Sequence, residues 1–247
     1  MTLPVYLVPT SDLRGRDADD LVRLSGPEGR HAVTVRRTAV GERLVLSDGA
    51  GLGVVGEVVA VGAGELTLRV DTIEELSEPS PRFVLVQALA KGDRDEQAIE
   101  AATECGVDEV VPWQAGRSIV SWRGERGEKA WRKWDALLIA ATKQSRRLRR
   151  PVLASTATTA QVTARLGAAA AAYVLHEDAG RPLAGLPLPA AGDVVLVVGP
   201  EGGIGPEELA AFEAVGAQAV RLGSTVLRSS SAGPAALAVL NAASRWR

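Results

Sequence analysis

The sequence has few of the residues that build disulfides and metal centres. Its 247 residues include one cysteine, Cys105, and two histidines, His31 and His176. A single cysteine excludes an internal disulfide and a cysteine-cluster metal site, and two histidines leave a zinc centre few ligands. We therefore expect no metal and a protein of the reducing cytoplasm.

Export and membrane signals are also missing. The amino terminus, "MTLPVYLVPTSD", lacks a basic segment followed by an apolar core, and no apolar run approaches the roughly 18 residues of a membrane span. We expect neither export nor membrane insertion.

Nucleotide-binding loops of the common kinds are absent or misplaced. No Gly-Lys pair is followed by Ser or Thr, which argues against nucleoside triphosphate hydrolysis. Gly51, Gly53 and Gly56 fit the spacing G-x-G-x-x-G, but the following "EVVAV" continues as a strand and no helix follows. These glycines therefore indicate a glycine-rich hairpin.

The pattern of apolar and turn-forming residues changes near "SEPSPR", residues 77–82. We interpret this segment as a linker that marks the boundary between residues 1–76 and 77–247. Before it, short apolar runs at 43–47, 56–61 and 65–70 are separated by turn residues, a pattern typical of a small barrel. After it, strands at 83–89, 108–112, 171–176, 194–198 and 218–222 alternate with helices at 95–105, 128–145 and from about 232. This alternation predicts an α/β fold with a parallel sheet.

The stretch "VVLVVGPEGGIGPEE" joins a strand to a glycine-rich loop. Val194–Val198 reads as a strand buried on both faces, so the loop leaves the carboxyl end of an interior strand, where α/β sheets bind ligands. Pro206 suits a first helical turn, followed by Glu207 and Glu208 at the positive end of the helix dipole. The pattern favours a ligand-binding loop without naming the ligand.

Charge is distributed unevenly although the net charge is only −2. Residues 112–150 contain eleven Lys or Arg against three acids, an asymmetry typical of contact with a phosphate backbone. Four of the five tryptophans lie there too: Trp113, Trp122, Trp131 and Trp134. Two interpretations stay open for them: stacking faces for unpaired bases, or core and subunit contacts.

The stretch "VRLGSTVLRSSSAGPAALAVL", residues 220–240, predicts a strand, a glycine turn and a helix capped by Ser229, Ser230 and Ser231. Arg228, just before that cap, is expected to orient an anionic substrate or to bridge to a neighbouring carboxylate.

Together these motifs resemble the RsmE family of ribosomal RNA uridine-N3 methyltransferases, in the knotted SPOUT superfamily. The resemblance covers nearly the whole chain, through "HAVTVRR", "ALAKGDRDEQAIEAATECGVDEVVPW", "VGPEGGIGPEE" and "RLGSTVLRSSSAG". It implies a PUA-like β-barrel that helps hold RNA, at 1–76, and a methyltransferase domain with a trefoil knot around a parallel sheet, at 77–247.

The resemblance also implies S-adenosylmethionine as cofactor and methylation of uridine N3 in 16S, small-subunit ribosomal RNA. Arg228 is the candidate catalytic residue. Cofactor-binding candidates are Leu175, His176, Gly199, Glu201, Gly202, Leu222, Gly223, Val226 and Leu227. RNA-binding candidates are Arg36, Arg37, Lys91, Arg94, Arg117, Arg147 and Arg149.

Several points stay open. Glu201 is either a general base or an electrostatic partner of the cofactor, and for His176 we favour placement by the backbone over catalysis. Where the family usually has Pro after Leu-Gly and Thr-Glu-Thr-Ala after Arg, this chain has Ser224 and "SSSA". The alternatives are therefore a catalytically impaired RNA-binding relative acting in ribosome assembly, and an α/β enzyme using another nucleotide. By analogy we expect a homodimer, with an assembled small subunit as substrate.

Overall fold

The computed structural model describes residues 3–246 and divides into two compact units. The first contains residues up to Glu78 together with Thr142–Arg150, and the second contains Pro79–Ala141 and Pro151 onward. Each unit has its own hydrophobic core. In the described residues no helix is both long enough and apolar enough to cross a membrane.

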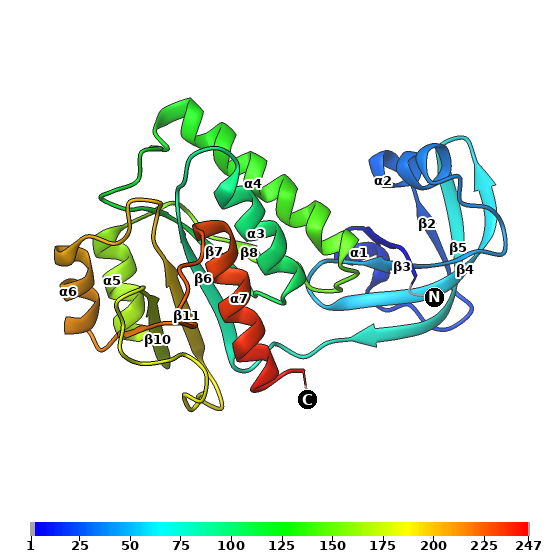
Figure 1. Cartoon of the computed structure of the whole chain (residues 1–247). Helices are drawn as coiled ribbons and strands as arrows, with labels where there is room; N and C mark the ends of the chain where they lie inside the picture. Colours follow the sequence, from blue (N-terminus) through cyan, green and yellow to red (C-terminus); the bar gives the residue numbers. More distant parts are fainter. Residues whose placement is uncertain (1–2, 247) are drawn as a thin grey trace. The chain divides into compact units, whose positions relative to one another are not determined.

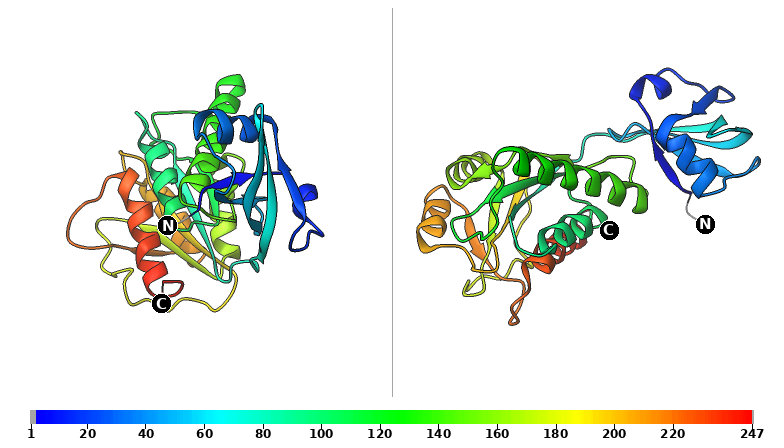
Figure 2. Two further views of the ribbon diagram at one scale, coloured as in Figure 1. Left: turned by 90° about the vertical axis from the view of Figure 1, so that its right-hand side faces the viewer. Right: turned by 90° about the horizontal axis from the view of Figure 1, so that it is seen from above.

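The first unit is a five-stranded sheet, coloured blue to cyan in Figures 1 and 2. Its strand order is β1-β3-β4-β5-β2, antiparallel except for the β1–β3 pair. The predicted hairpins are present, and β4 contains two of the three glycines whose spacing imitates a dinucleotide-binding motif. The elements are β1 (Val5–Leu7), α1 (Thr10–Leu13), β2 (Leu21–Leu24), α2 (Gly26–Arg30), a π-helical turn (His31–Val35), β3 (Arg43–Ser47), β4 (Leu52–Gly62) and β5 (Glu65–Glu75).

A distant segment completes this unit. The main-chain oxygen of Leu148 accepts hydrogen bonds from Ser47 Oγ at 2.8 Å and from the Gly51 N–H at 3.2 Å. Arg149 pairs with Glu78 at 2.8 Å and donates to the Leu76 carbonyl at 3.0 Å. The last part of the basic segment 112–150, residues 142–150, therefore belongs to the first unit.

The second unit contains the predicted parallel sheet, with strand order β12-β10-β11-β6-β7-β8. Strand order alone does not define a knot, so the trefoil knot stays a prediction. The strands are β6 (Arg82–Ala88), β7 (Glu109–Gln114), β8 (Val152–Leu153), β9 (Ala157–Thr158, paired with β7), β10 (Ala171–Leu175), β11 (Asp193–Val198) and β12 (Gln218–Val220). The helices are α3 (Arg94–Glu104), α4 (Gly124–Gln144), α5 (Thr159–Ala168), α6 (Pro206–Ala214) and α7 (Ser229–Ala242).

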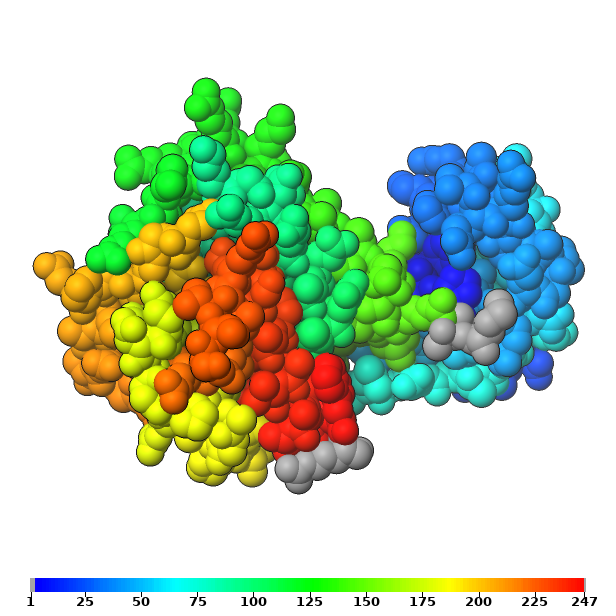
Figure 3. Space-filling view, viewed as in Figure 1, coloured from blue at the N-terminus to red at the C-terminus, as the bar shows by residue number. Residues whose placement is uncertain are grey.

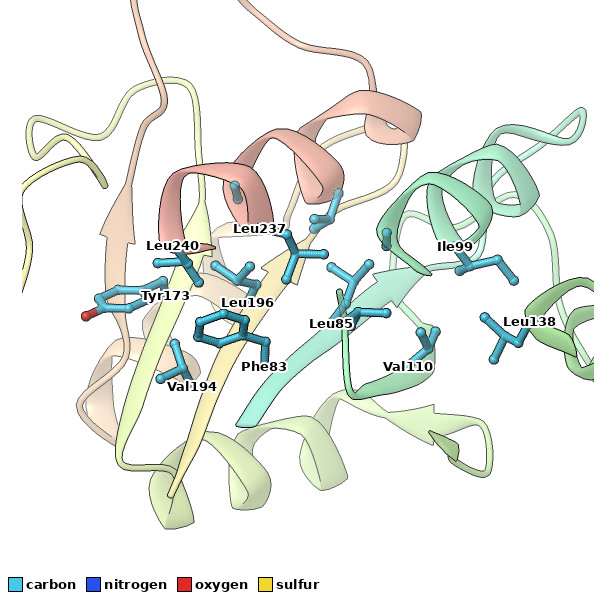
Figure 4. Packing of buried hydrophobic residues seen from close by; sticks show 14 of the residues in the cluster. Phe83, Leu85, Ile99, Val110, Leu138, Tyr173, Val194, Leu196, Leu237 and Leu240 are labelled. Atoms are coloured by element: carbon cyan, nitrogen blue, oxygen red, sulfur yellow. The ribbon is translucent and has the colours of Figure 1, made fainter. Parts of the chain in front are cut away.

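Helices cover both faces of this sheet because successive strand residues alternate between two cores. Phe83 and Leu85 point into the core under α3, α4 and α7, whereas Val84 and Val86 point into the core under α5 and α6. Figure 4 shows the first of these cores, with Leu237 and Leu240 from α7 packed over Leu196. Burial on both faces explains the uninterrupted apolar runs of β6 and β11.

Two expectations need correction. Helix α7 begins at Ser229, with Arg228 as its N-cap, so Ser229–Ser231 form the first turn and do not cap it. Helix α4 begins at Gly124, four residues before the predicted start. For the tryptophans, Trp113 and Trp134 are buried in the two cores, so the core interpretation holds for this pair.

Candidate functional site

A cavity of about 410 Å³ lies at the carboxyl ends of β10 and β11, beside the first turn of α7. Residues from three separate stretches line it: the end of β10, the loop after β11 and the segment leading into α7. This is the edge of the sheet where the glycine-rich loop was predicted to bind a ligand. The predicted site residues that line it are Leu175, His176, Gly199, Glu201, Val226, Leu227, Arg228 and Arg94.

The loop after β11 needs glycine at two positions for different reasons. Gly203 has φ of +71°, a conformation that L-residues with a side chain adopt only with strain. At Gly199, an added Cβ would lie 2.7 Å from the Ile204 side chain. The loop ends at Gly205, the N-cap of α6, with Pro206 at the first helical position as predicted.

Glu201 is held by groups from the start of α3. Its Oε1 accepts a hydrogen bond from the Lys91 N–H and one from Arg94 Nη1, both at 3.0 Å. Partial burial of this carboxyl favours its neutral form, but backbone hydrogen bonds and the Arg94 charge outweigh burial and lower the pKa of Glu201. The carboxylate is therefore ionised at neutral pH and anchors the glycine-rich loop to the residues before α3.

Two further groups fix the same loop. Arg117 Nη1 donates to the Gly202 carbonyl at 2.9 Å. Glu208, in the first turn of α6, accepts hydrogen bonds from the Gly205 N–H at 3.1 Å and from the Gly116 N–H and Thr159 Oγ1 at 2.8 Å each. Segments that follow β7, β9 and β11 are thereby joined at one edge of the sheet.

The end of β10 and the segment 222–227 form the apolar side of the site. Leu222, Val226 and Leu227 line a smaller cavity of about 80 Å³ with Leu175 and His176. The His176 N–H donates to the Val220 carbonyl at 3.0 Å, and its Nδ1 accepts from the Asp178 N–H at 3.2 Å. The neighbouring main chain thus fixes His176 on both sides. Gly202 and Gly223 lie in these loops but do not line either cavity.

The first turn of α7 brings two polar side chains to the cavity. Arg228 is exposed, and its carbonyl accepts the N–H groups of Ser231 and Ala232 at 2.9 and 3.0 Å. Ser229 Oγ is buried and has no hydrogen-bond partner among residues 3–246. A buried hydroxyl without a partner beside a cavity is an unused contact for a bound molecule.

The RNA-binding candidates fall into two groups. Lys91, Arg94 and Arg117 lie around the glycine-rich loop, as the hydrogen bonds above show. The other four belong to the first unit: Arg36 and Arg37 are exposed after the π-helical turn, and Arg147 and Arg149 are half-buried after α4. Arg149 already pairs with Glu78 and the Leu76 carbonyl, so its side chain has a structural role in the first unit.

Sequence reasoning missed two carboxylates that support the site. The first is Glu208, which it placed only at the helix dipole; its spacing of three residues from Gly205 was the available signal. The second is Asp95, whose buried carboxylate accepts the Ala90 N–H at 3.0 Å. Burial raises the pKa of Asp95, because its hydrogen bonds to the backbone only partly offset desolvation.

Comparisons with known proteins agree with this architecture. A family model described as "RNA methyltransferase domain" matches residues 77–241, and one described as "RNA methyltransferase PUA domain" matches residues 24–71. Ribosomal RNA small subunit methyltransferase E of Mycobacterium tuberculosis is 44% identical over 237 residues, which are 93% of this chain and 90% of the relative.

The fold is shared with solved structures. A Legionella pneumophila protein described as a methyltransferase, in complex with the bound cofactor SAM, is 28% identical with a TM-score of 0.81 over 98% of each chain. Ribosomal RNA small subunit methyltransferase E of Neisseria gonorrhoeae shares the fold, with a TM-score of 0.83 over 98% of each chain at 24% identity. The chain therefore belongs to the ribosomal RNA small subunit methyltransferase E family.

Proposed function

We propose that this chain transfers a methyl group from S-adenosylmethionine to N3 of a uridine in 16S, small-subunit ribosomal RNA. The observation that supports this most directly is the cavity formed jointly by the end of β10, the Gly199–Gly205 loop and residues 226–229. The loop and residues 226–229 lie within two of the motifs on which the family resemblance rests, "VGPEGGIGPEE" and "RLGSTVLRSSSAG".

The residues around the cavity fit S-adenosylmethionine. A volume of about 410 Å³ is in the range of small-molecule sites. Leu175, Val226 and Leu227 provide apolar surface for an adenine ring, and the unpartnered Ser229 hydroxyl offers a polar contact. The ionised Glu201 carboxylate lies beside the site of a cationic cofactor. When bound, this cofactor supplies a methyl group activated by a positively charged sulfur.

The protein's main task in such a reaction is to hold the uracil in line with the methyl group. Uridine N3 carries a proton and is occupied in base pairs, so the base must be unpaired and the proton must leave as the N3–C bond forms. We assign Arg228 to the negative charge that develops on the uracil ring. Its guanidinium is exposed at the cavity and has no hydrogen-bond partner among the described residues.

For Glu201 we favour a positioning and electrostatic role. Its Oε1 already accepts two hydrogen bonds, and its pKa is lowered, which weakens it as a proton acceptor. His176 has its Nδ1 hydrogen-bonded to the main chain, so we assign it to shaping the cavity. Gly202 and Gly223 complete the proposed cofactor loops through their backbone.

The proposed partners follow from the same function. We propose that the exposed Arg36 and Arg37 of the first unit bind the RNA backbone, and that Lys91, Arg94, Arg117 and Arg147 contribute further cations. We assign Arg149 mainly to the fold of the first unit. The trefoil knot, a homodimer, an assembled small subunit as substrate, a cytoplasmic location and the lack of a metal belong to the same proposal.

A specific observation favours the alternative of a catalytically impaired RNA-binding relative. The "SSSA" sequence places Ser230 where the family usually has a carboxylate, which fits an RNA-binding relative that has lost catalysis. Incubation with methyl-labelled S-adenosylmethionine and unmodified small or large ribosomal subunits tests both ideas. Label in small subunits alone supports the proposal. Cofactor binding without transfer to any subunit supports the impaired relative.

A further inference from the structure

A second, separate groove lies beside the first half of α4. It has a volume of about 590 Å³ and is lined by Trp122, Trp131, Glu128, Arg132, Ser155 and Thr156 together with two glycines. None of these residues lines the cofactor cavity, and none has a role in the mechanism above.

The two tryptophans of the groove are held in place but are not buried. The Trp131 indole N–H donates to the Ala154 carbonyl at 2.9 Å. The Trp122 ring packs edge-to-face on Trp134, with ring centroids 4.9 Å apart. Both Trp122 and Trp131 are half-buried, in contrast to the fully buried Trp134. The groove therefore presents fixed aromatic surface at a low cost in side-chain entropy.

The charge around this groove suits a polyanion. Residues 117–133 contain six Lys or Arg against two acids, Glu125 and Glu128. Arg132 lines the groove and is exposed, which places a guanidinium beside the tryptophans. Aromatic faces flanked by cations are the combination with which proteins hold single-stranded nucleic acid.

The groove lies near the same edge of the sheet as the cofactor cavity. The main-chain N–H of Trp122 donates a hydrogen bond to the side-chain oxygen of Gln114, the last residue of β7, at 3.2 Å. Arg117, in the same connection, binds the Gly202 carbonyl in the loop that borders the cavity. Strand β7 is two strands from β11, a separation of roughly 10 Å. Figure 3 shows the green surface of the segment that follows β7 adjoining the golden surface of the segment that follows β11.

We propose that the groove binds one unpaired base of the substrate RNA that flanks the target nucleotide. The base stacks on the Trp131 ring and lies on the side of the groove that Trp122 forms. Arg132 pairs with a neighbouring phosphate. Glu128, Ser155 and Thr156 offer hydrogen-bonding groups for the base edge or the ribose 2′-hydroxyl. This inference rests on the proposed function, because it needs single-stranded RNA at the neighbouring cavity.

Photo-crosslinking of the wild-type protein to unmodified small ribosomal subunits tests the groove directly. We expect a crosslinked nucleotide on a peptide that contains Trp122 or Trp131, together with crosslinks near Arg228. Crosslinks near Arg228 but none on the Trp122–Arg132 peptides would overturn the groove and leave the proposed function standing. Crosslinks to no part of the second unit would overturn both.

A pair of variants isolates the stacking face. Trp131→Phe and Trp131→Leu both lose the indole hydrogen bond to Ala154, but only Trp131→Phe keeps an aromatic ring. We expect Trp131→Leu to raise the Kd for the RNA at least about fivefold over Trp131→Phe, with equal affinity for S-adenosylmethionine. Equal RNA affinity of the two variants would contradict stacking. If Trp131→Leu fails to fold, Arg132→Gln is tested in its place. We expect Arg132→Gln to lower the salt dependence of RNA binding. An unchanged salt dependence would contradict the phosphate contact of Arg132.

Discussion

Glu201 Oε1 accepts a hydrogen bond from Arg94 Nη1 at 3.0 Å, which ties the glycine-rich loop after β11 to the first residue of α3. The two residues are 107 positions apart in the chain. This contact gives the glycine-rich loop a defined position beside the cavity.

Replacing Glu201 should weaken cofactor binding. Glu201→Gln removes the charge that pairs with Arg94, and because this pair is partly exposed we expect about a two- to fivefold higher Kd for S-adenosylmethionine by calorimetry. Glu207→Gln, on an exposed neighbour in α6, is the matched control and should leave the Kd unchanged. Equal effects of the two variants would contradict the anchoring role of Glu201.

The same contact predicts a pH dependence. The pKa of Glu201 is lowered in the folded protein, so its stabilising effect is present above the ordinary value of 4.5 and is lost as pH falls through the lowered pKa. Carbon-detected NMR of the Glu201 carboxyl should give a titration midpoint below 4.5, and Arg94→Gln should raise that midpoint. A midpoint that does not move in Arg94→Gln would mean that Arg94 does not influence this carboxyl.

Arg228 should matter for turnover more than for cofactor binding. We expect Arg228→Ala to lower kcat on RNA by about a hundredfold or more, as does removal of a group that stabilises developing charge. Its Kd for S-adenosylmethionine should stay within about twofold. Arg228→Lys, which keeps a positive charge, should recover part of the rate. An equal loss of cofactor affinity would show instead that Arg228 builds the pocket.

The backbone conformation of Gly203 predicts a local strain effect. Gly203→Ala places a Cβ on a residue with φ of +71°, a strain of about 1–2 kcal/mol, and should distort the loop and weaken cofactor binding about tenfold. Gly180→Ala serves as control, since a Cβ at Gly180 meets no atom within 4 Å and its φ is not in the left-handed region. Tight cofactor binding by Gly203→Ala would show that the loop tolerates this change.

The carboxyl-terminal residues should stabilise the second unit. Arg245 hydrogen-bonds the buried Asp108 carboxylate and lies 4.1 Å from the Phe83 ring centroid. Arg245→Ala should lower the free energy of unfolding by about 2 kcal/mol, because a buried charge loses a partner. All five tryptophans lie in this unit, so their fluorescence reports its unfolding. Lys133→Ala, which removes the exposed ion pair with Glu96, should lower the free energy of unfolding much less than Arg245→Ala does, and a similar loss in both variants would contradict this ranking.

Sequence patterns predicted the strands well because β6 and β11 are buried on both faces and carry uninterrupted apolar runs. They also placed Pro206 in the first turn of α6. They failed for α7: serines are good N-caps, yet Arg228 takes that position and the three serines enter the helix. The short β8 and β9 have two residues each, too few to show a period.

Long-range contacts could not be predicted from local pattern. Nothing near Arg149 indicates that it pairs with Glu78, 71 residues earlier, so the return of residues 142–150 to the first unit was unexpected. The boundary between residues 76 and 77 as a domain limit stays a prediction. The contacts of Arg94 and Arg117 with the glycine-rich loop also depend on the sheet order, which places β6 next to β11 and β7 one strand further away.

The identity of the methylated nucleoside decides whether the reaction takes place at uridine N3. Unmodified small ribosomal subunits are incubated with the protein and methyl-labelled S-adenosylmethionine, and the RNA is digested to nucleosides for mass spectrometry. Methylation at uridine N3 predicts labelled 3-methyluridine, formed at least about a hundredfold more slowly by Arg228→Ala than by the wild type. Label in any other nucleoside, or no label from a protein that binds the cofactor, would contradict it.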